Sequence, residues 1–248
     1  MYNKVKGDFK MCKTNLKKMV EDLGNLTDEG KIIKKLQEIG AKLINEYVIR
    51  IGNLTIEPLW IEAYYYNQKS FPDCNTHLSE KQKNHFGQLY FHEEGRGGFD
   101  ICLSNSSEFY LSFLLKATLI DDKFTTQTGI YDVLNNLGKK ESELENEKNI
   151  LFKREENKSS KIMHAQRVGI TKPCYHDQDL AVFPIDALSN DKYNFTFARK
   201  NLEPIVEKEI KKYIKENPNC TKQKCKEVCK NRFGWVPDII SNLVKDFD

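Results

Sequence analysis

The stretch Leu59-Trp60-Ile61-Glu62-Ala63-Tyr64-Tyr65-Tyr66 is apolar and aromatic except for a single carboxylate. Aromatic and β-branched residues favour strands, and residues 47–66 are rich in them. Gly52-Asn53 is a turn signal within this region. We therefore expect two strands on either side of the turn, with a carboxylate inside the second one.

The carboxylate of Glu62 is the first candidate for chemistry. Burial in an apolar strand raises the pKa of a carboxyl group unless a partner compensates, and this is how a general acid or base is prepared. The alternative is an inward glutamate that pairs with an arginine or a lysine and has only a structural role. The sequence leaves both interpretations open.

The rest of the chain predicts further strands and several helices. Strands are expected at residues 88–92, 99–103, 108–120, 161–170, 181–185 and 193–199, with a hairpin-like connection at 93–98. Three helices are expected before the tail. The first covers residues 8–24 and the third covers residues 129–137. The second follows an N-cap at Thr27 and carries one apolar stripe, made of Ile32, Leu36, Ile39 and Leu43.

These elements divide a single α+β domain into three parts. Residues 1–45 are N-terminal helices, 46–200 are the strand-rich core, and 201–248 are a charged helical tail with a break at Asn217-Pro218. Lys, Glu, Asn and Ser dominate residues 138–160, so we expect an exposed insertion there.

The composition is that of a globular protein, with 39% hydrophobic and 30% charged residues in a chain of 248. No apolar stretch reaches the about 18 residues that span a bilayer, and the start lacks the apolar region of a signal peptide. Seven cysteines without a C-x2-C pair are expected to be reduced thiols. We therefore expect an intracellular protein without a membrane partner. The net charge of +3 is too balanced to identify a nucleic-acid binder.

Histidines and aromatic residues follow the strand that holds Glu62. His77, His85 and His92 match no recognised metal-ligand spacing, and Cys220, Cys225 and Cys229 are expected to be reduced helix cysteines. We expect neither a metal nor an organic cofactor. Flat rings near a buried acid suit a heterocycle, which stacks on such rings with about 1 to 3 kcal/mol per base.

An ordered series of short motifs resembles the alkyladenine (methylpurine) DNA glycosylase family over roughly residues 40–200. In chain order the motifs are Glu62-Ala63-Tyr64, Asp73 to His77, Leu89-Tyr90-Phe91-His92, Phe113-Leu114-Leu115-Lys116-Ala117, Thr128-Gly129-Ile130, Arg167-Val168-Gly169-Ile170 and Tyr193-Asn194-Phe195-Thr196-Phe197. The resemblance implies a curved, mostly antiparallel sheet with peripheral helices.

The resemblance also implies an activity and a set of site residues. In that family a glutamate activates a water that attacks the sugar C1′ of a nucleotide flipped from the duplex, and Glu62 takes its place. The resemblance implies that the substrate is contacted by Tyr64, His77, Tyr90, His92, Cys102 and Lys116. It implies that the nucleic acid is contacted by Arg96 and Arg167. The expected function is a monofunctional base-excision DNA glycosylase that removes damaged purines from DNA with a damaged or unpaired base.

Departures from the family pattern leave rival functions open. His92 replaces a Tyr, Cys102 a base-discriminating Asn, and Lys116 an Arg. The connection at residues 93–98 offers no bulky wedge, and only Arg96 is long enough to reach between base pairs. This predicts a preference for single-stranded, mismatched or mononucleoside substrates. The rivals are a hydrolase of a free nucleoside, nucleotide or modified RNA, and a non-catalytic module that binds nucleic acid or protein.

Overall fold

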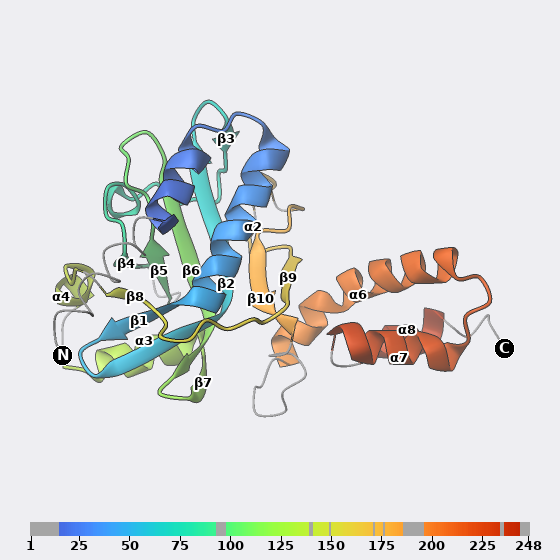
Figure 1. The fold of residues 1–248 in the computed structure, drawn as a ribbon. Coiled ribbons are helices and arrows are strands. Elements are labelled where there is room, and N and C mark those ends of the chain that lie inside the picture. The colour runs from blue at the N-terminus through green and yellow to red at the C-terminus, as the bar shows by residue number, and fades with distance from the viewer. Residues whose placement is uncertain are drawn as a thin grey trace.

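A computed structural model describes residues 15–92, 98–138, 141–148, 150–170, 172–175, 177–185, 196–233 and 236–243. They form an α+β domain in which helices lie around a curled antiparallel sheet (Figure 1). The predicted fold class and the mostly antiparallel sheet with peripheral helices are therefore confirmed.

The sheet contains ten strands in the described residues. They are β1 (Tyr47–Ile51), β2 (Leu54–Asn67), β3 (Phe71–Pro72), β4 (Gln88–Phe91), β5 (Phe99–Cys102), β6 (Tyr110–Ile120), β7 (Lys123–Thr126), β8 (Leu151–Lys153), β9 (Ile162–Ala165) and β10 (Ala181–Pro184). The main order is β4-β5-β6-β2-β1-β8, while β10 pairs with β2 and β9, β3 with β2, and β7 with β6. The predicted turn between β1 and β2 is present, with Gly52 at φ +58°.

Strand β2 holds the sheet together, because it pairs with β1, β3, β6 and β10. Its register with β6 shifts twice between Pro58 and Ile61, and it continues unbroken from Ile61 to Tyr66. Pro58 has no N–H to donate to the sheet. Side chains alternate between the two faces of a strand. Ala63 and Tyr65 therefore face the main core, whereas Glu62 and Tyr64 face the other side of the sheet.

Two N-terminal helices cover the main core. Figure 1 shows the helix of residues 15–24 next to α2 (Glu29–Glu46) over one face of the sheet. The predicted apolar stripe of α2 is buried there. The helix begins one residue later than predicted, since Asp28 and not Thr27 is the N-cap. Its Oδ1 accepts a hydrogen bond of 2.8 Å from the Lys31 N–H.

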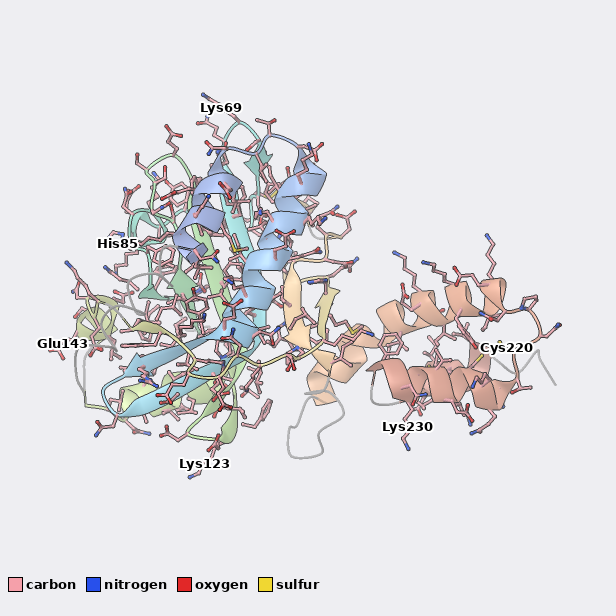
Figure 2. All side chains as sticks on the ribbon, in the orientation of Figure 1. Lys69, His85, Lys123, Glu143, Cys220 and Lys230 are labelled. Carbon is pink, nitrogen blue, oxygen red and sulfur yellow. A yellow bond between two sulfur atoms is a disulfide. The ribbon has the colours of Figure 1, made fainter. Side chains whose placement is uncertain are left out.

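The charged tail is helical as predicted and packs on the sheet through a second core. Helices α6 (Thr196–Glu216), α7 (Lys222–Phe233) and α8 (Asp238–Leu243) project beyond β9 and β10 in Figure 1. Ile210 and Phe233 of these helices share an apolar cluster with Trp60 and Phe183 of the sheet. Figure 2 places Cys220 at the turn between α6 and α7, with Lys230 pointing into solvent. No helix in the described residues is long and apolar enough to cross a membrane.

Residues 138–160, expected to be an exposed insertion, combine many exposed residues with a few buried ones in their described part. Helix α4 (Glu141–Glu145) lies against β4, and β8 extends the sheet beside β1. Leu144, Ile150 and Leu151 are buried, and buried Glu145 accepts a hydrogen bond of 2.9 Å from the Phe91 N–H. The polar composition of this segment led to the expectation of an insertion, but a few apolar residues attach it to the sheet.

Two other predictions differ from the structure. Helix α3 (Gln127–Asn135) lies close to its predicted position, but β9 is shorter than the strand expected at 161–170. The strand expected at 193–199 is wrong at residues 196–199, which form the first turn of α6, while 193–195 lie outside the described residues. Aromatic residues favour strands only weakly, and continuity with the long helix outweighs that preference here.

Gly40 provides a test of how closely α2 approaches the sheet. A Cβ atom at this position would stand 2.8 Å from Cγ2 of Val182 on β10. Gly40→Val should therefore lower the free energy of unfolding in urea by about 1 to 3 kcal/mol, because a β-branched neighbour cannot move aside. Gly30→Val on the same helix is the matched control and should change it by less than about 0.5 kcal/mol. Equal losses in the two variants would contradict this packing.

Candidate active site

A cavity of about 260 Å³ lies on the face of the sheet that carries Tyr64. Directly paired residues of antiparallel strands point to the same side. Tyr64 on β2 is paired with Ser112 on β6, and Leu114 of β6 is paired with both Glu62 and Asp100. The cavity lining includes Tyr64, His77, His92, Asp100, Lys116 and Val168.

The Glu62 side chain is fully buried and is not among the described lining residues, but two residues that line the cavity hold it. The Val168 backbone N–H donates to its Oε1 (2.9 Å), and the Tyr64 hydroxyl donates to its Oε2 (3.2 Å). Burial raises the pKa of Glu62 above its ordinary value of 4.5, against the opposing charge of Lys116 and these hydrogen bonds. Loss of water contact is thus the dominant electrostatic influence on this carboxyl group.

Arg167 pairs with Asp73 and not with Glu62. Its Nη1 lies 2.6 Å from Oδ2 of Asp73, with both side chains fully buried, and it also donates to the Ala63 carbonyl (3.2 Å). No ion pair among the described residues includes Glu62. The structural alternative for Glu62, a pair with an arginine or a lysine, is therefore wrong. Arg167, predicted to bind nucleic acid, has a buried guanidinium that lies 4.7 Å from the Tyr64 ring centre and supports that ring.

Aromatic and imidazole rings form one wall of the cavity. The ring centres of His77 and His92 are 4.5 Å apart, and His77 Nδ1 lies 3.2 Å from the Tyr90 hydroxyl. Both histidines line the cavity, whereas Tyr90 is buried behind them and is not among the described lining residues. Tyr90 therefore supports the wall. In the described part of the chain, no three His, Cys, Asp or Glu side chains are placed to hold a metal ion.

Asp100 is a second buried carboxylate at the cavity, and the sequence analysis missed it. Its Oδ1 lies 2.7 Å from His92 Nε2, and its Oδ2 accepts a hydrogen bond of 2.5 Å from the Ser112 hydroxyl. The signal that identified Glu62, a lone acid within an apolar strand, is also present in Phe99-Asp100-Ile101-Cys102. Asp100 was therefore predictable as a buried acid, but its partner Ser112 depends on the pairing of β5 with β6.

The remaining predicted residues have different positions. Lys116 lines the cavity, as does Lys172, which the sequence analysis did not single out. Cys102, predicted to contact the substrate, is fully buried and is not among the described lining residues. Burial also raises the pKa of its thiol well above the ordinary value. Arg96 and the other residues from 93 to 97 lie outside the described part of the chain.

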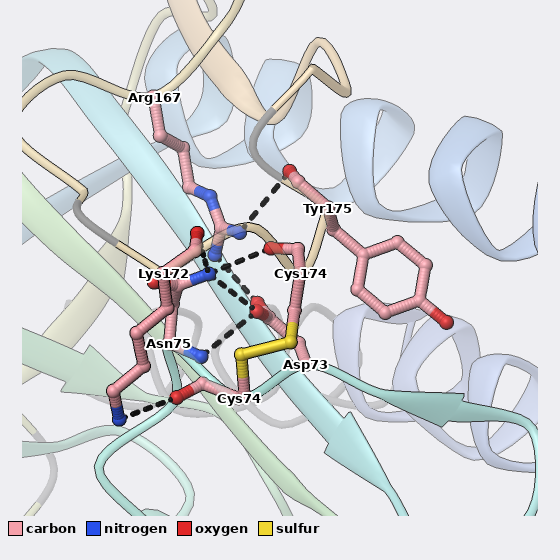
Figure 3. Close-up of a disulfide and its surroundings, with 7 residues drawn as sticks. All are labelled: Asp73, Cys74, Asn75, Arg167, Lys172, Cys174 and Tyr175. Atoms are coloured by element: carbon pink, nitrogen blue, oxygen red, sulfur yellow. Dashed lines mark hydrogen bonds and ion pairs between the residues drawn. A yellow bond between two sulfur atoms is a disulfide. The ribbon is translucent and has the colours of Figure 1, made fainter.

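A disulfide between Cys74 and Cys174 joins two loops that contribute to the cavity lining (Figure 3). Asn75 Nδ2 donates to the Cys174 carbonyl (2.6 Å), and Lys172 Nζ donates to the Cys74 carbonyl (2.8 Å). The expectation of reduced thiols is wrong for this pair. Nothing in the spacing of these cysteines indicated that their loops meet. The cysteines consequently no longer argue for a reducing compartment.

Comparison with known proteins does not assign the site. The chain matches no protein-family model, and a search of curated proteins found no match to it. The case for a function therefore depends on the cavity and on the residues around it.

The double variant Cys74→Ser/Cys174→Ser tests the contribution of the crosslink. Its free energy of unfolding should fall by about 2 to 5 kcal/mol, because the disulfide joins residues 100 positions apart. Urea unfolding with and without a thiol reductant measures this. Reductant should destabilise the wild type by a similar amount and leave the double variant unchanged. A reductant effect of equal size in both proteins would contradict the assignment.

Glu62→Gln tests the cost of the buried carboxylate. The amide preserves both hydrogen bonds, because its oxygen can accept from the Val168 N–H and its nitrogen can donate to the Tyr64 oxygen. A raised pKa means that the fold favours the protonated carboxyl group. This stabilisation is complete below the ordinary pKa of 4.5 and is lost as the pH rises through the pKa of the folded state.

The variant should therefore match the wild type in stability near about pH 4 and become progressively more stable than the wild type at higher pH. Urea unfolding of both proteins over this range measures the difference. A difference that stays constant with pH, or a variant that loses stability as the pH rises, would show that the carboxylate is not destabilised by burial.

Proposed function

We propose that this protein hydrolyses N-glycosidic bonds, with Glu62 as the general base that activates water. The proposal depends on one observation, a fully buried carboxylate that two cavity residues hold and that forms no ion pair among the described residues. Burying an ionisable group outside an ion pair costs free energy, and here the charges of Lys116 and Arg167 offset that cost only in part. A purely structural role explains such an arrangement poorly, whereas a base with a raised pKa next to a cavity is suited to proton abstraction.

The proposed step uses Glu62 as a proton acceptor. As a water oxygen attacks the sugar C1′, a water proton passes to Glu62, and the C1′–N bond breaks with its electron pair moving to the base. Each carboxylate oxygen has a further lone pair besides the one that the Val168 N–H or the Tyr64 hydroxyl occupies. Glu62 can therefore bind a water while these two donors fix the orientation of the carboxylate.

The dimensions and lining of the cavity support a nucleobase as the bound group. Its volume of about 260 Å³ lies just below the about 300 to 1,000 Å³ typical of small-molecule sites. Such a space suits one planar heterocycle. Tyr64, His77 and His92 supply rings on which it can stack.

The motifs that resemble alkyladenine DNA glycosylases meet around this cavity. Glu62-Ala63-Tyr64 lies on β2, Lys116 belongs to the matching segment of β6, and Val168 follows β9. This convergence supports an alkyladenine glycosylase-like fold and damaged purines as substrates. It extends the proposal to a monofunctional base-excision glycosylase without a cofactor.

Two substrate forms fit this chemistry, a nucleotide in DNA and a free nucleoside. Lys116 and Lys172 at the cavity favour a substrate that carries phosphates. Exposed lysines at helical spacing along α6 add positive charge at positions 208, 211, 212 and 215. The small cavity volume, in contrast, admits a free nucleoside equally well. We therefore propose DNA with a damaged or unpaired base, with a nucleoside as the second candidate.

Loss of base release in Glu62→Gln is the direct test of this function. Turnover should fall by about 10²-fold or more, because an amide cannot accept the proton of the water. The substrates are single-stranded and duplex oligonucleotides with hypoxanthine, ethenoadenine or 3-methyladenine, followed by alkaline cleavage, and the matching free nucleosides, followed by chromatography of the base.

Glu57→Gln is the matched control, because Glu57 lies on the same strand and pairs with Arg154 and Lys158 away from the cavity. It should turn over like the wild type. Wild-type turnover in Glu62→Gln would exclude Glu62 as the base. No release from any of these substrates by the wild type would favour a binding module.

A further inference from the structure

Three cysteines lie on α7 and the turn before it, and none of them takes part in the proposed hydrolysis. Cys220, Cys225 and Cys229 are free thiols, as expected, but Cys220 precedes α7 and only the other two lie within the helix. Cys225 and Cys229 are fully buried in the second core, whereas Cys220 is partly exposed at the turn (Figure 2). The Sγ atoms of Cys220 and Cys225 are 3.3 Å apart. An accessible thiol therefore touches a buried one.

The start of α7 explains why these two side chains touch. Thr221 acts as the N-cap, because its Oγ1 accepts a hydrogen bond of 3.3 Å from the Lys224 N–H. Cys220 is then the residue before the cap, N′, and Cys225 is the fourth residue of the helix, N4. Side chains at N′ and N4 pack together and fix how the chain enters a helix. The sulfur contact is therefore a consequence of how α7 begins.

The first turn of α7 is electrostatically unfavourable. It contains Lys222 and Lys224 and no acidic side chain. The N-terminus of a helix carries a partial positive charge, so cations in this turn destabilise it and favour fraying. The start of α7 consequently depends on the Thr221 cap and on the contact between the two sulfur atoms.

Helix geometry selects Cys220 as the partner of Cys225. A disulfide requires Cβ atoms about 3.5 to 4.5 Å apart, whereas residues four apart on a helix have Cβ atoms about 5 to 6 Å apart. Cys225 and Cys229 are such a pair, so they cannot bond without distortion of α7. A metal does not fit either, because the described residues include no three His, Cys, Asp or Glu side chains placed to hold one.

We propose that Cys220 and Cys225 are a redox-active pair of thiols that closes to a disulfide and thereby fixes the start of α7 to the turn after α6. The two sulfur atoms need only approach from 3.3 Å to the about 2.0 Å of an S–S bond. The bond replaces the contact between N′ and N4 with a covalent link in the turn where the lysines oppose the helix. Oxidation therefore suppresses fraying of α7.

The oxidant is a small disulfide such as oxidised glutathione. The thiolate of Cys220, the accessible member of the pair, attacks one sulfur of the small disulfide and releases the first small thiol. The sulfur of Cys225 then attacks Cys220 in this mixed disulfide, and the protein S–S bond forms as the second small thiol leaves. The protons of the two cysteines end on the two released thiols. Burial raises the pKa of the Cys225 thiol, so it is the second of the two to react.

Mass spectrometry after trypsin digestion reads the linkage directly, because cleavage after lysine separates the three cysteines. Cys220 falls in peptide 216–222, Cys225 in 225–226 and Cys229 in 227–230. The full chain is incubated with oxidised glutathione, blocked with N-ethylmaleimide and digested without a reductant. The wild type should yield peptide 216–222 linked to peptide 225–226, with the mass of two hydrogen atoms lost.

Two alanine variants and amide hydrogen exchange test the pairing and its effect. Cys229→Ala is the matched control and should form the same link as the wild type. Cys220→Ala should form no link at Cys225, and it spares the second core because Cys220 is at the turn. Oxidation should slow exchange of the amides at 222–225 by about fivefold or more in the wild type and in Cys229→Ala. It should leave their exchange in Cys220→Ala unchanged.

Three results would overturn the proposal. The first is a link from Cys220 to any cysteine other than Cys225. The second is a mixed disulfide of Cys220 with glutathione that does not resolve, or no reaction of Cys220 at all. The third is a correct link that leaves amide exchange at 222–225 unchanged, since the bond would then fix nothing. None of these measurements uses a substrate, so their outcome is independent of the proposed hydrolysis.

Discussion

The pairing of β2 with β6 is the constraint on which the candidate site depends. From Ile61 to Tyr66 the register is unbroken, so the alternation of the strand buries Ala63 and Tyr65 in the main core and turns Glu62 and Tyr64 to the opposite face. A shift by one residue would exchange these two sets. Packing of the core residues therefore fixes the face of the sheet on which Glu62 lies. The second apolar cluster, which holds α6 to α8 on the sheet, excludes water from the same face.

The buried carboxylates at this face differ in how their charge is balanced. Asp73 has a buried arginine at 2.6 Å and forms a conventional structural ion pair. Asp100 lies 2.7 Å from the His92 imidazole and accepts a hydrogen bond from the Ser112 hydroxyl. Glu62 has only a backbone N–H and a phenol as donors, and burial raises its pKa.

Local patterns predicted the elements and the central acid, whereas contacts distant in sequence decided the rest. Glu62 was identifiable because a lone carboxylate interrupts an apolar strand, and the stripe of α2 because its spacing is helical. The structural role of Arg167 was not identifiable from the sequence, because its partner Asp73 lies 94 residues away. The Cys74–Cys174 disulfide was missed for the same reason, because it needs two loops to meet across 100 residues. The edge strand β8 was not predicted, because most residues around it are polar. Its apolar residues form a strand only by pairing with β1.

The central claim is that Glu62 is a buried, weakened acid next to a nucleobase site. The most direct measurement is an NMR titration of the Glu62 carboxyl carbon in protein labelled with ¹³C at its glutamate carboxyl groups, with Glu62→Gln to assign the signal, without and with a purine nucleoside. The account predicts a midpoint above the ordinary 4.5 and a signal that moves when the nucleoside is added. A midpoint at or below 4.5, with a signal that no nucleoside displaces, would contradict it.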